Sequence, residues 1–175
     1  MAWITQNSSA SNDFGRRADP YLTPVARERF ERDYIPRYPT RRGALIQVLH
    51  AIQDEVGWLP MQAMEEVAQF IGITPSQVVD TATFYEEFFF KPRGKYTLWV
   101  CQSVSCEIMG STALQGKISE KLGIHHGETT PDGKFTLMHV ECIGACGGAP
   151  CALCNHKLHE NLSPDNVDAI LDSLP

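Results

Sequence analysis

The stretch VECIGACGGAPCALCN, residues 140–155, is the densest run of reactive side chains in the sequence. It holds four of the six cysteines of the chain, which are Cys142, Cys146, Cys151 and Cys154. Glycines lie between them, so the backbone there can fold closely around a small group. Four structures use thiols at such density: a disulfide staple, a zinc site, a redox thiol pair and an iron–sulfur cluster. The surrounding sequence has to distinguish between them.

The composition limits the class of protein. With 43% hydrophobic and 21% charged residues, the 175-residue chain has the make-up of an ordinary globular protein. Its net charge of −6 argues against general nucleic-acid binding. The polar start of the chain lacks the apolar core of a secretory signal, and no stretch reaches the ~18 apolar residues of a membrane span. We therefore expect a reducing, cytoplasmic location, where clustered cysteines bind metals or catalyse more often than they form disulfides.

The first half of the sequence predicts helices. Residues 1–22 are polar and aperiodic, and we expect a tail that is disordered or ordered only by a partner. Residues 23–92 contain four stretches with apolar residues at helical spacing, which predict a small helical bundle. In the last of them Thr74, Pro75 and Gln77 have the order of an N-cap, a first-turn proline and a capping-box glutamine.

The second half predicts a different architecture. Residues 96–100 and 135–140 read as strands, and two shorter strands are expected between 150 and 159. A helix is predicted between Ser111 and Gly123, and another after Ser163. This order predicts an α/β sandwich with a mixed sheet over residues 93–175. The expected fold class of the whole chain is α+β.

Two cysteine pairs each follow a predicted strand. Cys101 and Cys106 have the spacing C-x4-C, and Cys142 and Cys146 have the spacing C-x3-C. Loops at the same edge of one sheet would bring these four thiolates together, which is the number of ligands that a [2Fe–2S] cluster needs. The helix that begins near Ser111 would aim its positive end at Cys106. Zinc sites more often use C-x2-C pairs, so the spacing favours a cluster and leaves zinc as the alternative.

Five motifs resemble, in order, the landmarks of one family. They are VGWLP (56–60), VVDTATFYEEFFFKPRGKY (78–96), CQSVSCEIMG (101–110), TTPDGKFTL (129–137) and VECIGACGGAP (140–150). The family is that of the thioredoxin-like [2Fe–2S] ferredoxins, which form the small subunit of the NADH-oxidising module of respiratory complex I. The resemblance covers about Tyr38 to the C-terminus. It implies a helical bundle followed by a thioredoxin-like domain, and it implies that Cys101, Cys106, Cys142 and Cys146 are the cluster ligands.

The resemblance also implies a function. The chain would be an electron-transfer subunit with one [2Fe–2S] cluster near the flavin of a partner subunit that oxidises NADH, as in NADH:quinone oxidoreductase. FMN and NADH are expected in the partner only, since no glycine-rich nucleotide loop is present in this sequence. The isolated chain would have no catalytic activity, and the hetero-oligomeric complex would hold it on the cytoplasmic side, peripheral to the membrane.

Three alternatives stay open. The chain could be the equivalent subunit of an NAD-linked hydrogenase or formate dehydrogenase, because close relatives in the family serve those enzymes. It could also be a free-standing ferredoxin, although the helical bundle would then have no explanation. The third alternative is a zinc-stabilised binding module whose bundle recruits a partner.

The remaining candidates have plainer explanations. Cys151, Cys154, His156 and His159 form a C-x2-C-x-H-x2-H pattern that a second metal site could use. Strand alternation would point the two thiols apart, so we expect two free cysteines that act as small hydrophobes and do not bind the cluster. For His139, a packed or solvated imidazole is favoured over a role in tuning the cluster.

The aromatic run near residue 90 has two readings, a core segment or a docking surface. It contains Phe84, Tyr85, Phe88, Phe89 and Phe90. Because a redox centre without a nucleotide loop has to exchange electrons with another protein, we expect residues 24–90 to dock onto the flavoprotein. Interfaces of stable complexes are often aromatic at the centre, so we expect Phe88 and Phe89 to contribute to this surface.

Overall fold

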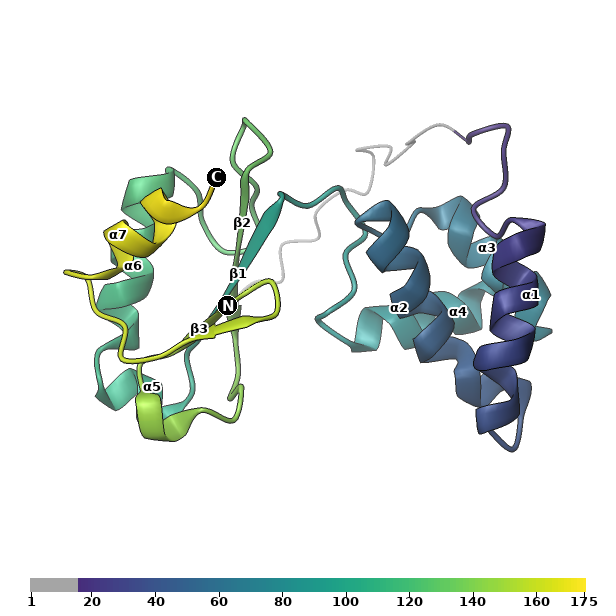
Figure 1. Cartoon of the computed structure of the whole chain (residues 1–175), viewed down its shortest axis with the longest axis horizontal. Helices are drawn as coiled ribbons and strands as arrows, with labels where there is room; N and C mark the ends of the chain where they lie inside the picture. The colour runs from purple at the N-terminus through teal and green to yellow at the C-terminus, as the bar shows by residue number, and fades with distance from the viewer. Residues whose placement is uncertain (1–15) are drawn as a thin grey trace, which may run out of the picture. The chain divides into compact units, whose positions relative to one another are not determined.

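The computed structural model of the chain describes residues 16–175. The described residues belong to two compact units that meet in sequence between Pro92 and Arg93 (Figure 1). The first 15 positions of the predicted tail lie outside the described residues. In the part of the chain that the structure describes, no helix is both long enough and apolar enough to cross a membrane.

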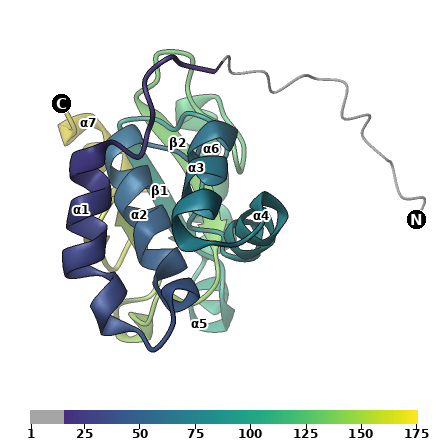
Figure 2. The same ribbon diagram turned by 90° about the vertical axis from the view of Figure 1, so that its right-hand side faces the viewer.

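The first unit is helical. Its α-helices are α1 (Pro24–Asp33), α2 (Leu45–Val56), α3 (Met61–Ile71) and α4 (Pro75–Phe84), with 3-10 turns at Ile35–Arg37 and Arg41–Ala44. The predicted capping box starts α4: the Thr74 side chain accepts a hydrogen bond from the Gln77 N–H, and the Gln77 side chain accepts one from the Thr74 N–H. α3 packs against both α2 and α4. Figure 2 shows α4 almost end-on, while α1 and α2 are seen from the side.

The core of the first unit consists of the apolar faces of its helices, and residues before α1 add to it. Leu22 is 1% exposed, and its backbone N–H donates a 2.8 Å hydrogen bond to Glu66 of α3. The backbone N–H of Arg17 donates to the Gln62 side chain at 3.0 Å. Residues 16–22, which fall within the predicted tail, therefore lie against α3. The polar composition of this segment did not predict its order, which depends on the burial of Leu22 and on these hydrogen bonds to α3.

The second unit is an α/β sandwich. Its strands are β1 (Tyr96–Cys101), β2 (Phe135–Val140), β3 (Ala152–Cys154) and β4 (Lys157–His159), and its helices are α5 (Val104–Ile108), α6 (Ser111–Leu122) and α7 (Val167–Ser173), with a 3-10 turn at Cys146–Gly148. The sheet order is β2-β1-β3-β4. β1 and β2 are parallel, whereas β3 and β4 pair antiparallel with their neighbours. The mixed sheet and the helical unit confirm the predicted α+β class.

α6 and α7 cover one face of this sheet (Figure 1). The core between them contains Leu98 and Val100 of β1, Leu114 and Ile118 of α6, and Leu171 of α7, each at most 5% exposed. Burial of these side chains fixes the parallel pairing of β1 and β2, whose last residues, Cys101 and Val140, lie opposite each other. The loops after both strands therefore emerge at the same edge of the sheet.

The approach to β1 depends on a glycine. A Cβ at Gly94 would lie 2.7 Å from the carbonyl carbon of Phe135 and 2.9 Å from its nitrogen. Instead, the Gly94 N–H donates a 2.6 Å hydrogen bond to the hydroxyl of Thr136. A larger residue would push the start of β1 away from β2, and so disturb the strand pair that positions both loops.

A buried amide holds the segment that follows α4. Gln53 of α2 is 4% exposed. Its side-chain N–H donates to the Glu87 carbonyl at 2.8 Å, and its carbonyl oxygen accepts from the Phe89 N–H at 2.8 Å. Both partners are backbone groups outside regular secondary structure, and this one side chain satisfies the hydrogen bonds of both.

We expect Gln53→Leu to destabilise the first unit by about 2 kcal/mol, because two backbone groups would lose their partners. Gln47→Leu on the same helix is the matched control, since Gln47 is exposed; it should change the free energy of unfolding by at most about 0.5 kcal/mol. Urea unfolding followed by far-ultraviolet circular dichroism measures both. Equal effects of the two substitutions would show that the Gln53 hydrogen bonds do not stabilise this segment.

Candidate functional site

The first cysteine pair lies at the end of β1. Cys101 is the last residue of the strand, and Cys106 lies in the five-residue helix α5. The sequence pattern did not predict α5, which is too short to show a period. Both side chains are buried, at 2% and 1% exposure. The Ser111 hydroxyl, at the start of α6, donates a hydrogen bond to the Cys101 carbonyl and so ties the strand end to that helix.

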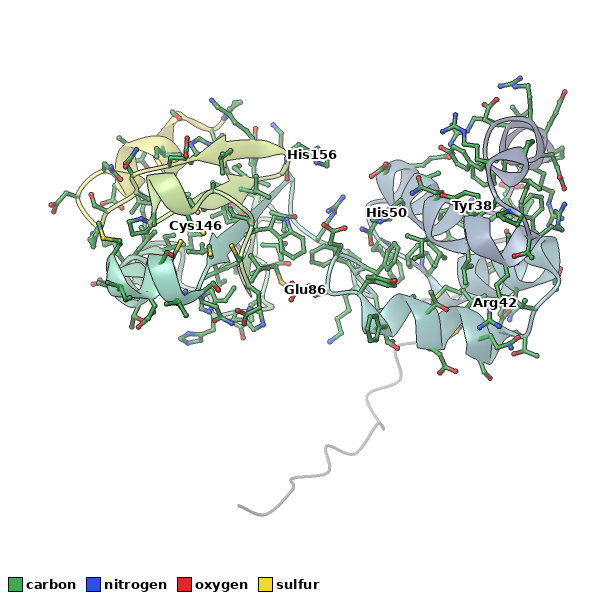
Figure 3. The ribbon with its side chains drawn as sticks, turned by 90° about the horizontal axis from the view of Figure 1, so that it is seen from below. Tyr38, Arg42, His50, Glu86, Cys146 and His156 are labelled. Carbon is green, nitrogen blue, oxygen red and sulfur yellow. The ribbon has the colours of Figure 1, made fainter. Side chains whose placement is uncertain are left out.

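The second cysteine pair lies in the loop after β2 and is exposed. The sulfur atoms of Cys142 and Cys146 are 3.5 Å apart, and Figure 3 shows other sulfur atoms close to Cys146 in that view. The loop turns at Gly144, whose φ of 82° is in the left-handed region that favours glycine. This turn lets the Gly144 N–H donate to the Cys142 sulfur at 3.4 Å.

Contacts between the two loops show that they meet. The backbone N–H groups of Ser103, from the first loop, and Ile143, from the second, both lower the pKa of Cys101 against the larger, raising effect of burial. Ile143 and Ala145 of the second loop also pack against a buried cluster that consists of Cys101, Cys106, Ala149 and Cys151. The structure thus brings both predicted loops to one edge of the sheet, as the parallel strands require.

A third buried thiol joins the first pair. The Cys151 sulfur is 3.6 Å from that of Cys106, and the sulfur atoms of Cys101, Cys106 and Cys151 all lie within 4.8 Å of one another. The Cys101 N–H donates to the Cys151 carbonyl at 3.1 Å, so the pairing of β1 with the segment before β3 holds this thiol in place. Cys154 lies instead in the core under the sheet. Strand alternation predicted that the two thiols point apart, but it did not predict that Cys151 joins Cys101 and Cys106, because that contact depends on the pairing of β1 with the segment before β3.

Cys101 and Cys142, one from each pair of predicted ligands, differ in acidity. Burial raises the pKa of the Cys101 thiol. Burial, followed by the neighbouring Cys106, raises the pKa of Cys151 to about 12. The Gly144 N–H, followed by a hydrogen bond with Cys146, lowers the pKa of Cys142. Cys142 therefore offers a thiolate more readily than an ordinary thiol, whereas Cys101 and Cys151 stay protonated until a cation compensates their charge.

These features fit a [2Fe–2S] cluster. The donor set is four thiols at one edge of the sheet, and the 3.5 Å between Cys142 and Cys146 allows both to bind one iron. The N–H groups directed at sulfur would stabilise the negative charge of the group. Which thiols bind the irons remains our prediction from the sequence: Cys101, Cys106, Cys142 and Cys146.

The second metal site that the sequence allowed is not formed. Among residues 16–175, the single set of three or more cysteine, histidine or carboxylate ligands close enough to share an ion is Cys101, Cys106 and Cys151. Cys154, His156 and His159 do not join it. Burial lowers the pKa of His159, which is the reverse of what an acidic partner would do.

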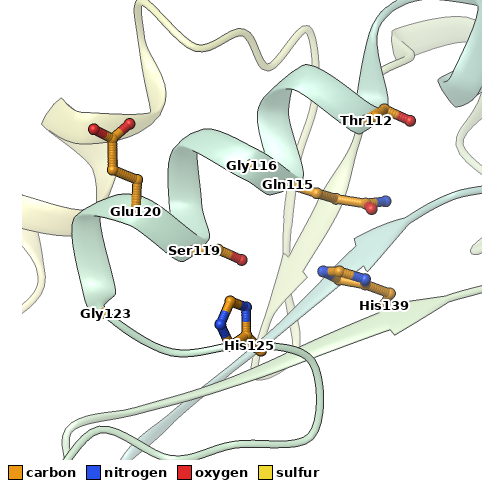
Figure 4. Close-up of a pocket in the computed structure, with 8 residues that line it drawn as sticks. All are labelled: Thr112, Gln115, Gly116, Ser119, Glu120, Gly123, His125 and His139. Atoms are coloured by element: carbon orange, nitrogen blue, oxygen red, sulfur yellow. The ribbon is translucent and has the colours of Figure 1, made fainter.

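His139 is partly buried and packed beside another histidine. Its backbone N–H donates to Nδ1 of His126 at 2.9 Å, and the two rings are 5.1 Å apart. Burial, and then His126, lowers the pKa of His139. With His125 it lines an open pocket of about 630 Å³ against the polar face of α6 (Figure 4). No cysteine lines this pocket, so it is separate from the thiols.

The aromatic run after α4 is divided between surface and core. Phe84 is 80% exposed and Tyr85 is 41% exposed, and their rings stack edge to face at 5.1 Å. Phe88 is only 5% exposed and packs on the His50 ring at 4.6 Å. The expectation that Phe88 contributes a docking surface is therefore wrong, because the hydrogen bonds of Gln53 fold this segment inward. Phe89 is half-buried, so it does not offer an exposed side chain to a partner either.

Comparisons with known proteins agree with this geometry. The family model described as "Thioredoxin-like [2Fe-2S] ferredoxin" matches residues 32–175. The chain is 46% identical over 137 residues to an NADH-quinone oxidoreductase subunit of Rhizobium meliloti (strain 1021), which is 78% of this chain and 82% of that protein. It is 38% identical over 148 residues to NADH-quinone oxidoreductase subunit 2 of Thermus thermophilus, with coverage of 83% and 82%.

Two further relatives are longer than this chain. An NADH-quinone oxidoreductase subunit of Mycobacterium tuberculosis (strain H37Rv) is 37% identical over 143 residues, which is 82% of this chain and 57% of that protein. The crystal structure of an NAD+-reducing [NiFe]-hydrogenase in the air-oxidized state matches with a TM-score of 0.64 and 26% identity. That match covers 75% of this chain and 24% of the hydrogenase chain.

The difference in acidity predicts an order of alkylation for the protein without a cluster. Since the thiolate is the nucleophile, Cys142 should react with iodoacetamide at a lower pH than an ordinary thiol, and its rate should fall only as the pH drops below its lowered pKa. The buried Cys151 should react last. Peptide mapping by mass spectrometry after timed labelling measures this order. Labelling of Cys151 as fast as Cys142 would contradict the burial and pKa directions described above.

Proposed function

The chain belongs to the thioredoxin-like [2Fe–2S] ferredoxin family, and we propose that it carries one [2Fe–2S] cluster as an electron-transfer subunit of an NADH-oxidising complex of the NADH:quinone oxidoreductase type. The observation that carries this proposal is the meeting of the two cysteine loops at one edge of the sheet. When bound, the cluster supplies one-electron transfer. The chain is then a component of an oxidoreductase and depends on its partners for chemistry with NADH.

The residues around the thiols have separate parts in holding the cluster. Cys101 and Cys106 would bind it from the buried side, where apolar neighbours exclude water. Cys142 and Cys146 would bind it from the exposed loop. The Gly144 N–H, which donates to the Cys142 sulfur, would offset part of the added negative charge, and such hydrogen bonds raise the reduction potential of a cluster.

The partner is a flavin-binding subunit. The sequence has no nucleotide loop of its own, so flavin and NADH have to bind to another chain. The exposed, stacked pair Phe84 and Tyr85 is a candidate contact for it, since large aromatic side chains are enriched at the centres of interfaces. Through this complex the chain would lie on the cytoplasmic side, peripheral to the membrane.

A second candidate is the equivalent subunit of an NAD+-reducing hydrogenase, which the similarity to the solved hydrogenase favours. The relatives at 37–46% identity favour the quinone oxidoreductase. Identification of the subunits that co-purify with the chain separates the two. A zinc-stabilised binding module would instead be colourless, whereas an iron–sulfur protein absorbs visible light.

We expect about two irons and two sulfides per chain, the content of one [2Fe–2S] cluster. Cys142→Ala should remove most of the iron, because a ligand is lost. Cys154→Ala should retain it, because Cys154 lies in the sheet core, away from the other thiols. Metal analysis and electron paramagnetic resonance of the reduced protein measure both. Zinc as the main metal in the wild-type protein, or full iron content in Cys142→Ala, would refute the assignment.

Phe84→Asp should weaken co-purification with the flavoprotein by at least about tenfold, as charge at the centre of an interface is costly, and should leave the cluster spectrum unchanged. The matched control is Val25→Asp on α1, which is 77% exposed, close to the 80% of Phe84. Because both side chains are exposed, neither substitution should unfold the helical unit. Equal retention of the flavoprotein by the two variants would exclude Phe84 from the docking surface.

A further inference from the structure

The three buried thiols form a compact donor set that the four-cysteine cluster does not account for. Cys106 and Cys151 are 3.6 Å apart at sulfur, and Cys101 completes a group within 4.8 Å. In a tetrahedral zinc site with Zn–S bonds of about 2.3 Å, neighbouring sulfurs are about 3.8 Å apart. The Cys106 and Cys151 sulfurs therefore already lie at the spacing that a single small cation requires, and the Cys101 sulfur lies within 4.8 Å of both.

The surroundings of the trio favour a soft cation. The side chains packed against it are apolar, namely Ala149, Ile143 and Ala145. All three thiols are at most 2% exposed. Thiolate ligands in such a setting select thiophilic metals such as zinc over magnesium or calcium, which prefer oxygen.

The trio is also held by the backbone. The Cys101 N–H donates to the Cys151 carbonyl, and β1 pairs with β3 directly beyond this bond. Cys106 is fixed by α5, whose first turn closes with a 2.9 Å hydrogen bond from the Glu107 N–H to the Ser103 carbonyl. Three donors that are positioned before binding lose little conformational entropy when a metal arrives.

We propose that the chain without its cluster binds one thiophilic divalent cation of the zinc class through Cys101, Cys106 and Cys151. Three S–metal bonds form as the three thiols release three protons to solvent, and no electrons are transferred. A solvent molecule completes the tetrahedron, as in zinc sites with three protein ligands. The burial that disfavours free thiolates is offset by the charge of the bound cation.

One consequence rests on the function proposed above. The cation and the cluster share Cys101 and Cys106, so they exclude each other. Cys151 is the ligand that distinguishes the two states: it binds the cation and is released when the cluster occupies the loops. This gives Cys151 a role that a small hydrophobic side chain in a strand would not have.

The experiment is an anaerobic titration of the full-length, cluster-free chain with Co²⁺, followed by displacement with Zn²⁺. Sulfur-to-cobalt charge-transfer absorption reports thiolate ligation, and its end point gives the stoichiometry. We expect one equivalent of Co²⁺ in the wild-type protein. Cys151→Ala should weaken binding by at least about tenfold, since even loss of an outer-shell partner costs that much.

Matched variants identify the ligand set. Cys154→Ala removes a thiol that is also buried, in the neighbouring strand, and it should bind Co²⁺ as the wild type does. A Cys142→Ala/Cys146→Ala double variant should also retain binding. If that double variant loses Co²⁺ while Cys151→Ala retains it, the cation uses the four-cysteine set and the proposal is overturned.

Two measurements keep the test decisive. Far-ultraviolet circular dichroism checks that each variant is folded. If Cys151→Ala is unfolded, Cys151→Ser, which preserves the size of the side chain, replaces it. Unchanged Co²⁺ affinity in the folded Cys151 variant overturns the proposal. Iron and sulfide analysis of the wild-type protein before the cluster is removed tests the proposed function separately. An iron-containing wild type with no Co²⁺ site after cluster removal would therefore refute the cation site alone.

Discussion

The parallel pairing of β1 with β2 is the constraint on which the site depends. It places Cys101 opposite Val140, so that the loops after both strands leave the sheet at one edge. The helix α6 lies between these strands in sequence and covers the sheet, and its buried leucine and isoleucine hold the pair in register. The two loops that carry the cysteine pairs, far apart in sequence, thereby meet.

The environment of the thiols then sets their chemistry. One pair is buried among apolar side chains. The other is exposed on a loop that turns at Gly144, whose N–H donates to the Cys142 sulfur. Burial raises the pKa of Cys101, whereas the Gly144 N–H lowers the pKa of the exposed Cys142. The edge of the sheet therefore has one side that is shielded from water and one that is accessible. Such an arrangement suits a centre that has to be shielded from water and still exchange electrons with another protein.

The helical unit contributes in another way. Its core is closed by Gln53, which pairs two backbone groups of the segment after α4 and turns Phe88 inward. The same fold leaves Phe84 and Tyr85 on the surface. The buried Phe88 therefore stabilises this unit, whereas the exposed Phe84 and Tyr85 are available to a partner.

The sequence by itself determined the α+β class, the capping box of α4, the strands of the mixed sheet and the family to which the chain belongs. These features depend on local periodicity and on motif order, which one chain records directly. The tertiary structure alone decided that Leu22 and Phe88 are core residues, that Cys106 lies in a short helix, and that Cys151 joins Cys101 and Cys106 while Cys154 does not. Burial and the register between distant strands arise from contacts across the fold, and residue spacing along the chain carries no record of them.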